Sequence, residues 1–125
     1  MTRAIAFAVS MCLASAAQAA DWAHFATCGG PGGIRLYSYD KSSVQTQGDN
    51  KLVSVRGDYS QVQGSRSKEA RIRWSVNCRD RTFVELSRTE FQSNRTILAD
   101  YATPTGAMGI SPSSAPQKLF QQVCA

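Results

Sequence analysis

The most regular pattern in the chain is Ala70-Arg71-Ile72-Arg73-Trp74-Ser75-Val76-Asn77-Cys78-Arg79, residues 70–79. Apolar and polar side chains alternate through the whole segment. Because successive side chains of a β-strand point to opposite faces, this strand should have one buried face and one wet, basic face. Such a half-buried strand is typical of an antiparallel sheet that is open to solvent on one side.

Other segments extend the predicted sheet on both sides of this strand. Residues 79–81 are typical of a turn, and residues 82–91 of the partner strand in a hairpin. Further strands are predicted at 21–26, 34–39, 52–59 and 97–102, with turns rich in Gly, Asp, Asn and Ser between them. Residues 28–33, Cys-Gly-Gly-Pro-Gly-Gly, are expected to form a mobile loop. The sequence therefore predicts about five to six antiparallel strands.

The end of the chain has a helical pattern instead. Ser114 can cap a helix, and Gln117 follows the cap by three residues. Ala115, Leu119 and Val123 are spaced four apart, which places them on one helix face. A helix this short needs to pack against other structure in order to persist. We expect an α+β fold, a small antiparallel sheet with a short C-terminal helix packed on one face.

The first 19 residues are typical of a secretory signal peptide. Arg3 gives a positive start, residues 4–14 are mostly apolar, and Ala17-Gln18-Ala19 is a small-x-small cleavage site. Cleavage would leave a single domain at residues 20–125. It would remove one of the 14 Lys and Arg residues, against 9 Asp and Glu, so this domain stays basic. Cys12 follows Met11 rather than a small residue, so ordinary cleavage is expected and lipidation is not.

Export sets the expected location of the protein. Beyond the signal peptide, no segment reaches the roughly 20 apolar residues that a membrane-spanning helix needs. We therefore expect a protein of the periplasm or the cell surface, without a transmembrane segment.

Three cysteines remain in residues 20–125. An oxidising compartment favours disulfides, and an odd number leaves one thiol free or bonded to another chain. Pairing Cys78 with Cys124 would close a loop of about 46 residues and fasten the C-terminus. Cys28 would then be a free thiol, or would link two copies in a homodimer. The sequence alone leaves pairings of Cys28 with Cys78 or with Cys124 open.

Several short segments recur together in one known family. They are Trp22 after the cleavage site, the run 37–44 (Tyr-Ser-Tyr-Asp-Lys-Ser-Ser-Val), Ser67-Lys68 before a strand ending in Cys78, and residues 110–114 before a helix ending in Val123-Cys124. With these features the chain resembles the surface-adhesin protein E family of Gram-negative bacteria. The resemblance implies a small antiparallel sheet with a packed C-terminal helix, a Cys78–Cys124 bond and binding of host proteins at the cell surface.

The candidate binding residues are cations gathered within residues 66–81. They are Arg66, Lys68, Arg71, Arg73, Arg79 and Arg81. Arg71, Arg73 and Arg79 should share the outer face of one strand, where alternate side chains lie roughly 6–7 Å apart. Such a stripe suits polyanions or acidic host proteins. Nucleic acid is not expected, because no aromatic side chains interleave with these cations for stacking.

The other polar residues form no pattern that is typical of catalysis or of metal binding. His24 has no neighbouring nucleophile and carboxylate, and no cysteines or histidines have metal-ligand spacing. Glu85 and Glu90, five residues apart, are expected on opposite strand faces, with Glu85 opposite Arg71 or Arg73.

These observations lead to one functional hypothesis and one alternative. We expect a non-enzymatic exported binding module, adhesin-like, without cofactor or metal, which recognises host proteins or polyanionic surface ligands through its basic sheet face. The alternative is a periplasmic inhibitor or accessory subunit of an envelope enzyme or complex.

Overall fold

The structure, a computed structural model, describes residues 19–125. The predicted signal peptide, with Cys12, lies outside the described residues except for Ala19. Within the described part, the chain forms eight strands and one α-helix. Their bounds are β1 Trp22–Gly30, β2 Gly33–Asp40, β3 Gln45–Gln47, β4 Asn50–Asp58, β5 Glu69–Asn77, β6 Thr82–Phe91, β7 Ile97–Tyr101, β8 Met108–Gly109 and α1 Ala115–Val123.

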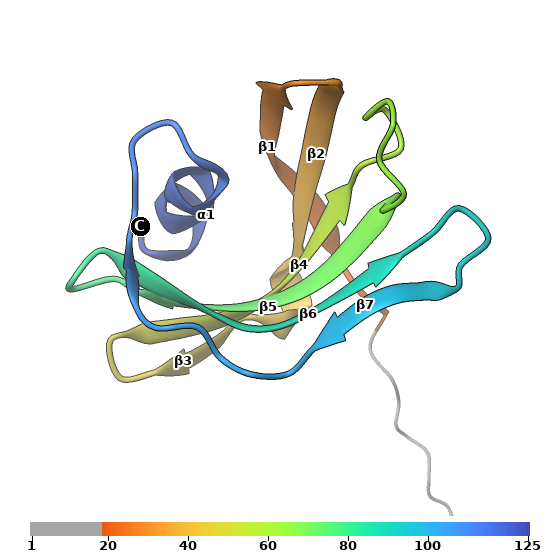
Figure 1. The fold of residues 1–125 in the computed structure, drawn as a ribbon. Helices are drawn as coiled ribbons and strands as arrows, with labels where there is room; N and C mark the ends of the chain where they lie inside the picture. The colour runs from red at the N-terminus through yellow and green to blue at the C-terminus, as the bar shows by residue number, and fades with distance from the viewer. Residues whose placement is uncertain (1–18) are drawn as a thin grey trace, which may run out of the picture.

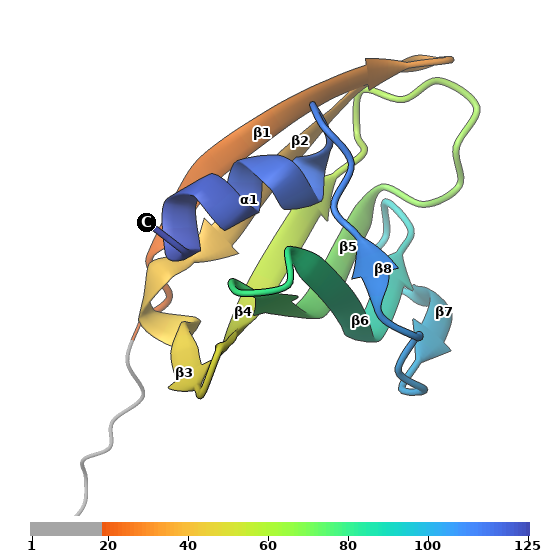
Figure 2. The ribbon, with the colours of Figure 1, turned by 90° about the vertical axis from the view of Figure 1, so that its left-hand side faces the viewer.

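All strands belong to one antiparallel sheet that curls into a half-barrel (Figures 1 and 2). The strand order is β1-β2-β4-β5-β6-β7, while β3 pairs with β4 and β8 with β6. The prediction of five to six strands was too low. The strands it missed, β3 and β8, have three and two residues, all exposed. Neither has the alternation of buried and exposed side chains that marks a strand in a sequence.

The sheet has two distinct faces, as the alternation in residues 70–79 predicts. In the register of β4 and β5, Val53 lies opposite Trp74 and Val55 opposite Ile72, and all four are buried. We call the side that carries them the inner face and the opposite side the outer face.

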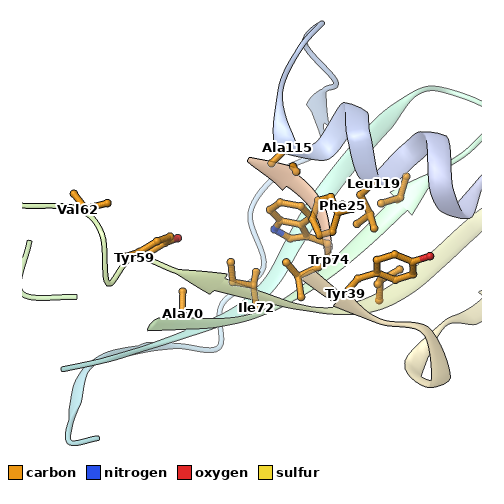
Figure 3. Packing of buried hydrophobic residues seen from close by; sticks show 13 residues of the cluster. Phe25, Tyr39, Tyr59, Val62, Ala70, Ile72, Trp74, Ala115 and Leu119 are labelled. Carbon is orange, nitrogen blue, oxygen red and sulfur yellow. The ribbon is translucent and has the colours of Figure 1, made fainter. Parts of the chain in front are cut away.

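The helix packs against the inner face, beside β1 (Figure 2). Leu119 is fully buried and points from α1 toward the side of the sheet that carries Phe25 and Trp74 (Figure 3). The predicted N-terminal cap is confirmed, because the Gln117 backbone N–H donates to Ser114 Oγ at 3.2 Å. The helix thus covers the apolar surface that the alternating strands create.

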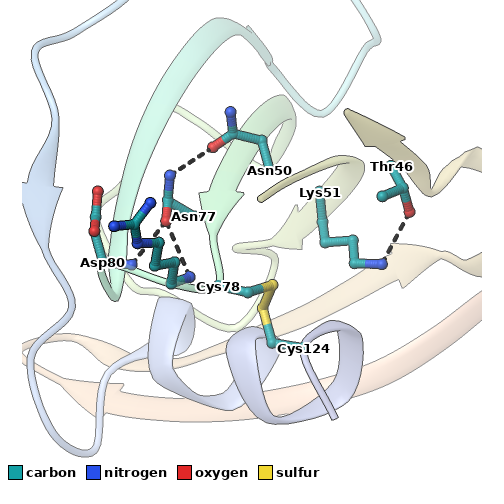
Figure 4. Close-up of a disulfide and its surroundings, with 8 residues drawn as sticks. Thr46, Asn50, Lys51, Asn77, Cys78, Asp80 and Cys124 are labelled. Carbon is teal, nitrogen blue, oxygen red and sulfur yellow. Dashed lines mark hydrogen bonds between the residues drawn. A yellow bond between two sulfur atoms is a disulfide. The ribbon is translucent and has the colours of Figure 1, made fainter. Parts of the chain in front are cut away.

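A disulfide joins Cys78, just after β5, to Cys124 at the end of α1 (Figure 4). The two Cα atoms lie 5.5 Å apart. The Asn77 side chain shapes the turn after β5 by accepting hydrogen bonds from the backbone N–H groups of Arg79 and Asp80. The predicted pairing is confirmed, and Cys28 is the free cysteine of the described residues.

The prediction of a mobile loop at residues 28–33 was wrong. Cys28 lies within β1, opposite Arg35 of β2, and only a tight turn separates the two strands. Gly32 and Gly33 have φ values of 86° and 139°, which side chains disfavour. The Gln63 N–H also donates to the Gly32 carbonyl at 2.8 Å, so the turn is tied to the loop after β4. Glycines here permit a close backbone approach rather than motion.

Candidate anion-binding site on the outer face

The cations at the end of β5 do not extend the predicted stripe. β5 ends at Asn77, so Arg79 lies in the following turn, where its guanidinium is 3.9 Å from Asp49. Arg81 follows in the same turn with a φ of 56°, and its guanidinium lies over the ring of Phe120, 4.8 Å from the centroid. These two arginines therefore belong to the turn and the helix end.

Arg66 and Lys68 precede β5 and are also separate from its outer face. Arg66 is exposed in the loop that joins β4 to β5. The backbone of Lys68 is hydrogen-bonded to two segments, because its N–H donates to the Phe91 carbonyl and its carbonyl accepts from the Tyr59 N–H. Of the six candidate residues, only Arg71 and Arg73 lie together on the outer face of β5.

Arg71 and Arg73 line a hollow of about 380 Å³ on this face. We call it the outer hollow. Its other side-chain walls come from four neighbouring segments of the sheet, namely Trp22 of β1, Asp40 at the end of β2, Ser54 of β4, and Ser87 and Thr89 of β6, with Ala20 at the rim. The hollow thus combines two guanidinium groups, one carboxylate, three hydroxyls and one indole.

Two contacts hold the arginines of the outer hollow in place. The Arg71 guanidinium lies over the Trp22 ring, 5.5 Å from its centroid, which is a favourable cation–π distance. Arg73 Nη1 donates to Ser54 Oγ at 3.1 Å. The sequence did not predict Trp22 as a site residue, because two strands, β2 and β4, separate β1 from β5 in the sheet.

Glu69 forms ion pairs with several neighbouring arginines beside the hollow. Its carboxylate pairs with Arg71, lies 3.3 Å from Arg56 Nε and lies 3.8 Å from Arg95. The Arg56 contact is an ion pair without a hydrogen bond, because this buried Nε–H is not aimed at the carboxylate. One carboxylate therefore faces three guanidinium groups, and this part of the outer face keeps an excess of positive charge.

A second polar cluster lies on the inner face, on β6. Glu85 accepts hydrogen bonds of 3.0 Å from Arg88 and of 3.1 Å from the Trp74 indole N–H. Arg88 also reaches Glu90 and the Tyr59 hydroxyl, at 3.3 Å each. Glu85 and Glu90 thus share one face, contrary to the prediction of opposite faces.

A β-bulge explains this difference. The register shifts between Arg73 and Trp74, so Glu85 lies opposite Trp74 while Ser87 lies opposite Arg73. The extra residue, Leu86, reverses the facing of the strand. Glu85 therefore points inward, so the prediction that it pairs with Arg71 or Arg73 was wrong.

Ion pairing and hydrogen bonding favour the charged carboxylate form of Glu85 in this cluster. Burial alone would raise the pKa of Glu85, but hydrogen bonds from Arg88 and Trp74 hold it below its ordinary value. Burial likewise opposes the charge of Arg88, whereas hydrogen bonds to Glu85 and Tyr59 raise its pKa. The cluster is consequently an ion-paired network that braces β6.

Comparison with protein families matched residues 26–125 to the family described as surface-adhesin protein E. The chain belongs to the surface-adhesin protein E family. The resemblance that the sequence motifs indicated is therefore confirmed over most of the chain. Comparisons with curated proteins and with solved structures gave no significant match.

Membership of a surface-adhesin family agrees with the expectation of an exported protein. Within residues 19–125, no helix of this protein E family member has the length and hydropathy of a membrane span. In the same residues, His, Cys, Asp and Glu side chains do not gather in any group of three that could hold a metal ion.

The Glu85–Arg88 network of this protein E domain predicts a loss of stability in acid. The unfolded-state pKa of a glutamate is about 4.3, and the folded-state pKa of Glu85 is lower. Its contribution to stability is therefore complete above about pH 4.3 and is lost as the pH falls through the folded value. We expect Glu85→Gln to lower the melting temperature at pH 7 and to have a much smaller effect at pH 3. An equal effect at both pH values would contradict this assignment.

Proposed function

We propose that the protein is an exported, non-enzymatic surface adhesin that binds anionic ligands through the outer face of its sheet. Membership of the surface-adhesin protein E family supports the adhesive role. The observation that carries the choice of surface is the outer hollow, where Arg71 and Arg73 converge with Trp22 and three hydroxyls. Host proteins with acidic segments and polyanionic surface ligands share the chemistry that such a site recognises.

A charge-matched pair of variants tests this proposal. Arg71→Ala with Arg73→Ala removes two guanidinium groups from the hollow, whereas Arg66→Ala with Arg79→Ala removes two that lie outside it. Since each charged hydrogen bond contributes about 1.5–3 kcal/mol, we expect the first variant to bind heparin at least tenfold more weakly, as an order of magnitude. The second variant should lose much less.

The measurement is elution from a heparin column in a salt gradient, with melting temperatures as the control for folding. Both arginines of the hollow are on an exposed sheet face, and Glu69 keeps Arg56 and Arg95 as partners in the variant. The fold should therefore survive. Equal retention of the two double variants would show that general charge, and not the outer hollow, is responsible for binding.

The alternative role, a periplasmic inhibitor or accessory subunit, has one structural observation in its favour. Ile97 and Tyr101 of β7 are 59% and 55% exposed, and β7 is an edge strand of the sheet. Exposed apolar residues on an open edge are typical of a surface that another protein covers. Capture of one stoichiometric envelope protein, dependent on Ile97 and Tyr101 but not on Arg71, would favour this role over adhesion.

A further inference from the structure

We propose that the outer hollow binds an acidic sugar unit, a saccharide ring that carries one carboxylate or sulfate group. This inference rests on the proposed function, because it names the ligand class for the same surface. Beyond binding of the anionic group, it proposes that Trp22 and the three hydroxyls contact the sugar ring.

The acidic group of the sugar would lie between Arg71 and Arg73. The two residues are next-but-one neighbours on β5, so their side chains leave the same face roughly 6–7 Å apart. Each guanidinium has five N–H donors, of which the structure uses one in each: Nε of Arg71 toward Glu69 and Nη1 of Arg73 toward Ser54. The remaining donors suit the paired oxygens of a carboxylate or a sulfate.

The sugar ring would lie against Trp22 and the hydroxyl side chains. A saccharide presents C–H groups on its faces and hydroxyls around its rim, so a site for it needs both apolar and polar walls. Trp22 is partly exposed, and the part of its indole that the Arg71 guanidinium leaves uncovered supplies the apolar wall. Ser54 and Ser87 supply hydroxyls that can both donate and accept hydrogen bonds, and the Thr89 hydroxyl, which donates to Asp100, can accept one. A simple anion site would need neither the indole nor these hydroxyls.

Two carboxylates near the hollow favour a ligand unit with a single charge. Asp40 lines the hollow and accepts hydrogen bonds from the Ser42 hydroxyl and from the N–H groups of Asp21 and Ser42, which hold its pKa below the ordinary value. Asp100 accepts a 2.9 Å hydrogen bond from Thr89. These negative charges limit the positive excess of the site. Densely charged chains such as polyphosphate or polyglutamate would therefore fit it less well than one acidic sugar.

The amino terminus of the mature chain would belong to the same site. Ala20 lines the hollow, and the predicted cleavage after Ala19 would make it the first residue. Its ammonium group would then add a positive charge at the rim. The test must accordingly use protein that begins at Ala20 and carries no N-terminal tag.

Calorimetric titration of this mature protein with four ligands tests the ligand class. The ligands are a uronic-acid oligosaccharide, a sulfated oligosaccharide, a neutral oligosaccharide of the same length, and polyglutamate. We expect one or both acidic sugars to bind at least tenfold, as an order of magnitude, more tightly than the neutral sugar and polyglutamate. The two acidic sugars separate a carboxylate from a sulfate as the preferred group. Binding of polyglutamate as tight as that of the acidic sugars would overturn the inference.

Variants of Trp22 separate this inference from the proposed function. Because Trp22 supplies the apolar wall of the site, Trp22→Ala should weaken acidic-sugar binding at least about fivefold, a change of about 1 kcal/mol. It should change polyglutamate binding less, and Trp22→Phe should retain most of the sugar affinity. If Trp22→Ala binds every ligand as the parent protein does, the sugar site is wrong while the anion-binding face stands. If the Arg71 and Arg73 double variant also binds every ligand unchanged, the proposed function fails as well.

Discussion

Replacing Cys78 and Cys124 by alanine is expected to lower the free energy of unfolding by about 3–4 kcal/mol. The bond spans 46 residues of sequence and ties the last turn of α1 to the end of β5. Without it, the unfolded chain gains the entropy of an open loop, and the short helix keeps only its packing contacts. A loss of this size is a large part of the stability of a domain of about 100 residues.

Urea denaturation of the mature protein measures this effect, and Cys28→Ala is the matched control. Cys28 is unpaired in β1, so its replacement should change the free energy of unfolding far less. A double cysteine variant as stable as the parent would mean that the helix stays docked through its apolar face alone.

Leu119→Ala is expected to lower the free energy of unfolding by about 3 kcal/mol, since buried leucines cost about 2–5 kcal/mol when truncated. Leu119 is fully buried in the core cluster between the helix and the sheet (Figure 3). Its replacement leaves a cavity at the centre of the interface that the disulfide fastens.

Lys118→Ala is the control for this change, because Lys118 directly precedes Leu119 in α1 and its side chain is exposed. Alanine is a good helix former, so the control should stay within about 0.5 kcal/mol of the parent. Equal melting curves for the two variants would show that α1 contributes little to the core.

The periodic parts of this fold could be predicted from the sequence. Residues 70–79 alternate without interruption, so the burial of Ile72, Trp74 and Val76 followed directly. The cap at Ser114 and the spacing of Ala115 and Leu119 gave the helix and its buried face. These patterns are local, and the packing of the sheet agrees with them.

The bulge at Leu86 could not be predicted, because a strand pattern counts residues and a bulge adds one without a signature in composition. It turned Glu85 inward, onto Trp74, and brought it to the same face as Glu90. A regular strand would have placed Glu85 beside the outer arginines instead. One inserted residue therefore changed the charge of both faces.

Only some of the residues that line the outer hollow could be predicted from the sequence. The cationic pair Arg71 and Arg73 followed from alternation, but Trp22 reaches the same site from β1, about 50 positions earlier in the chain. Such a meeting depends on sheet curvature and strand order, which no local pattern encodes. Arg79 also fell outside the site, because the strand ended two residues before it.

An NMR titration of the mature protein with a sulfated oligosaccharide tests the central claim, that the outer face binds anionic ligands, most directly. The protein has two tryptophans, one on each side of the sheet, whose indole N–H signals report on the two faces. We predict that Trp22 and the backbone amides of Ser54, Arg71, Arg73 and Thr89 shift together, while the Trp74 indole and α1 remain unchanged. Chemical-shift changes centred on Trp74, α1 or the β7 edge, with no change at the Trp22 indole, would contradict binding at the outer face.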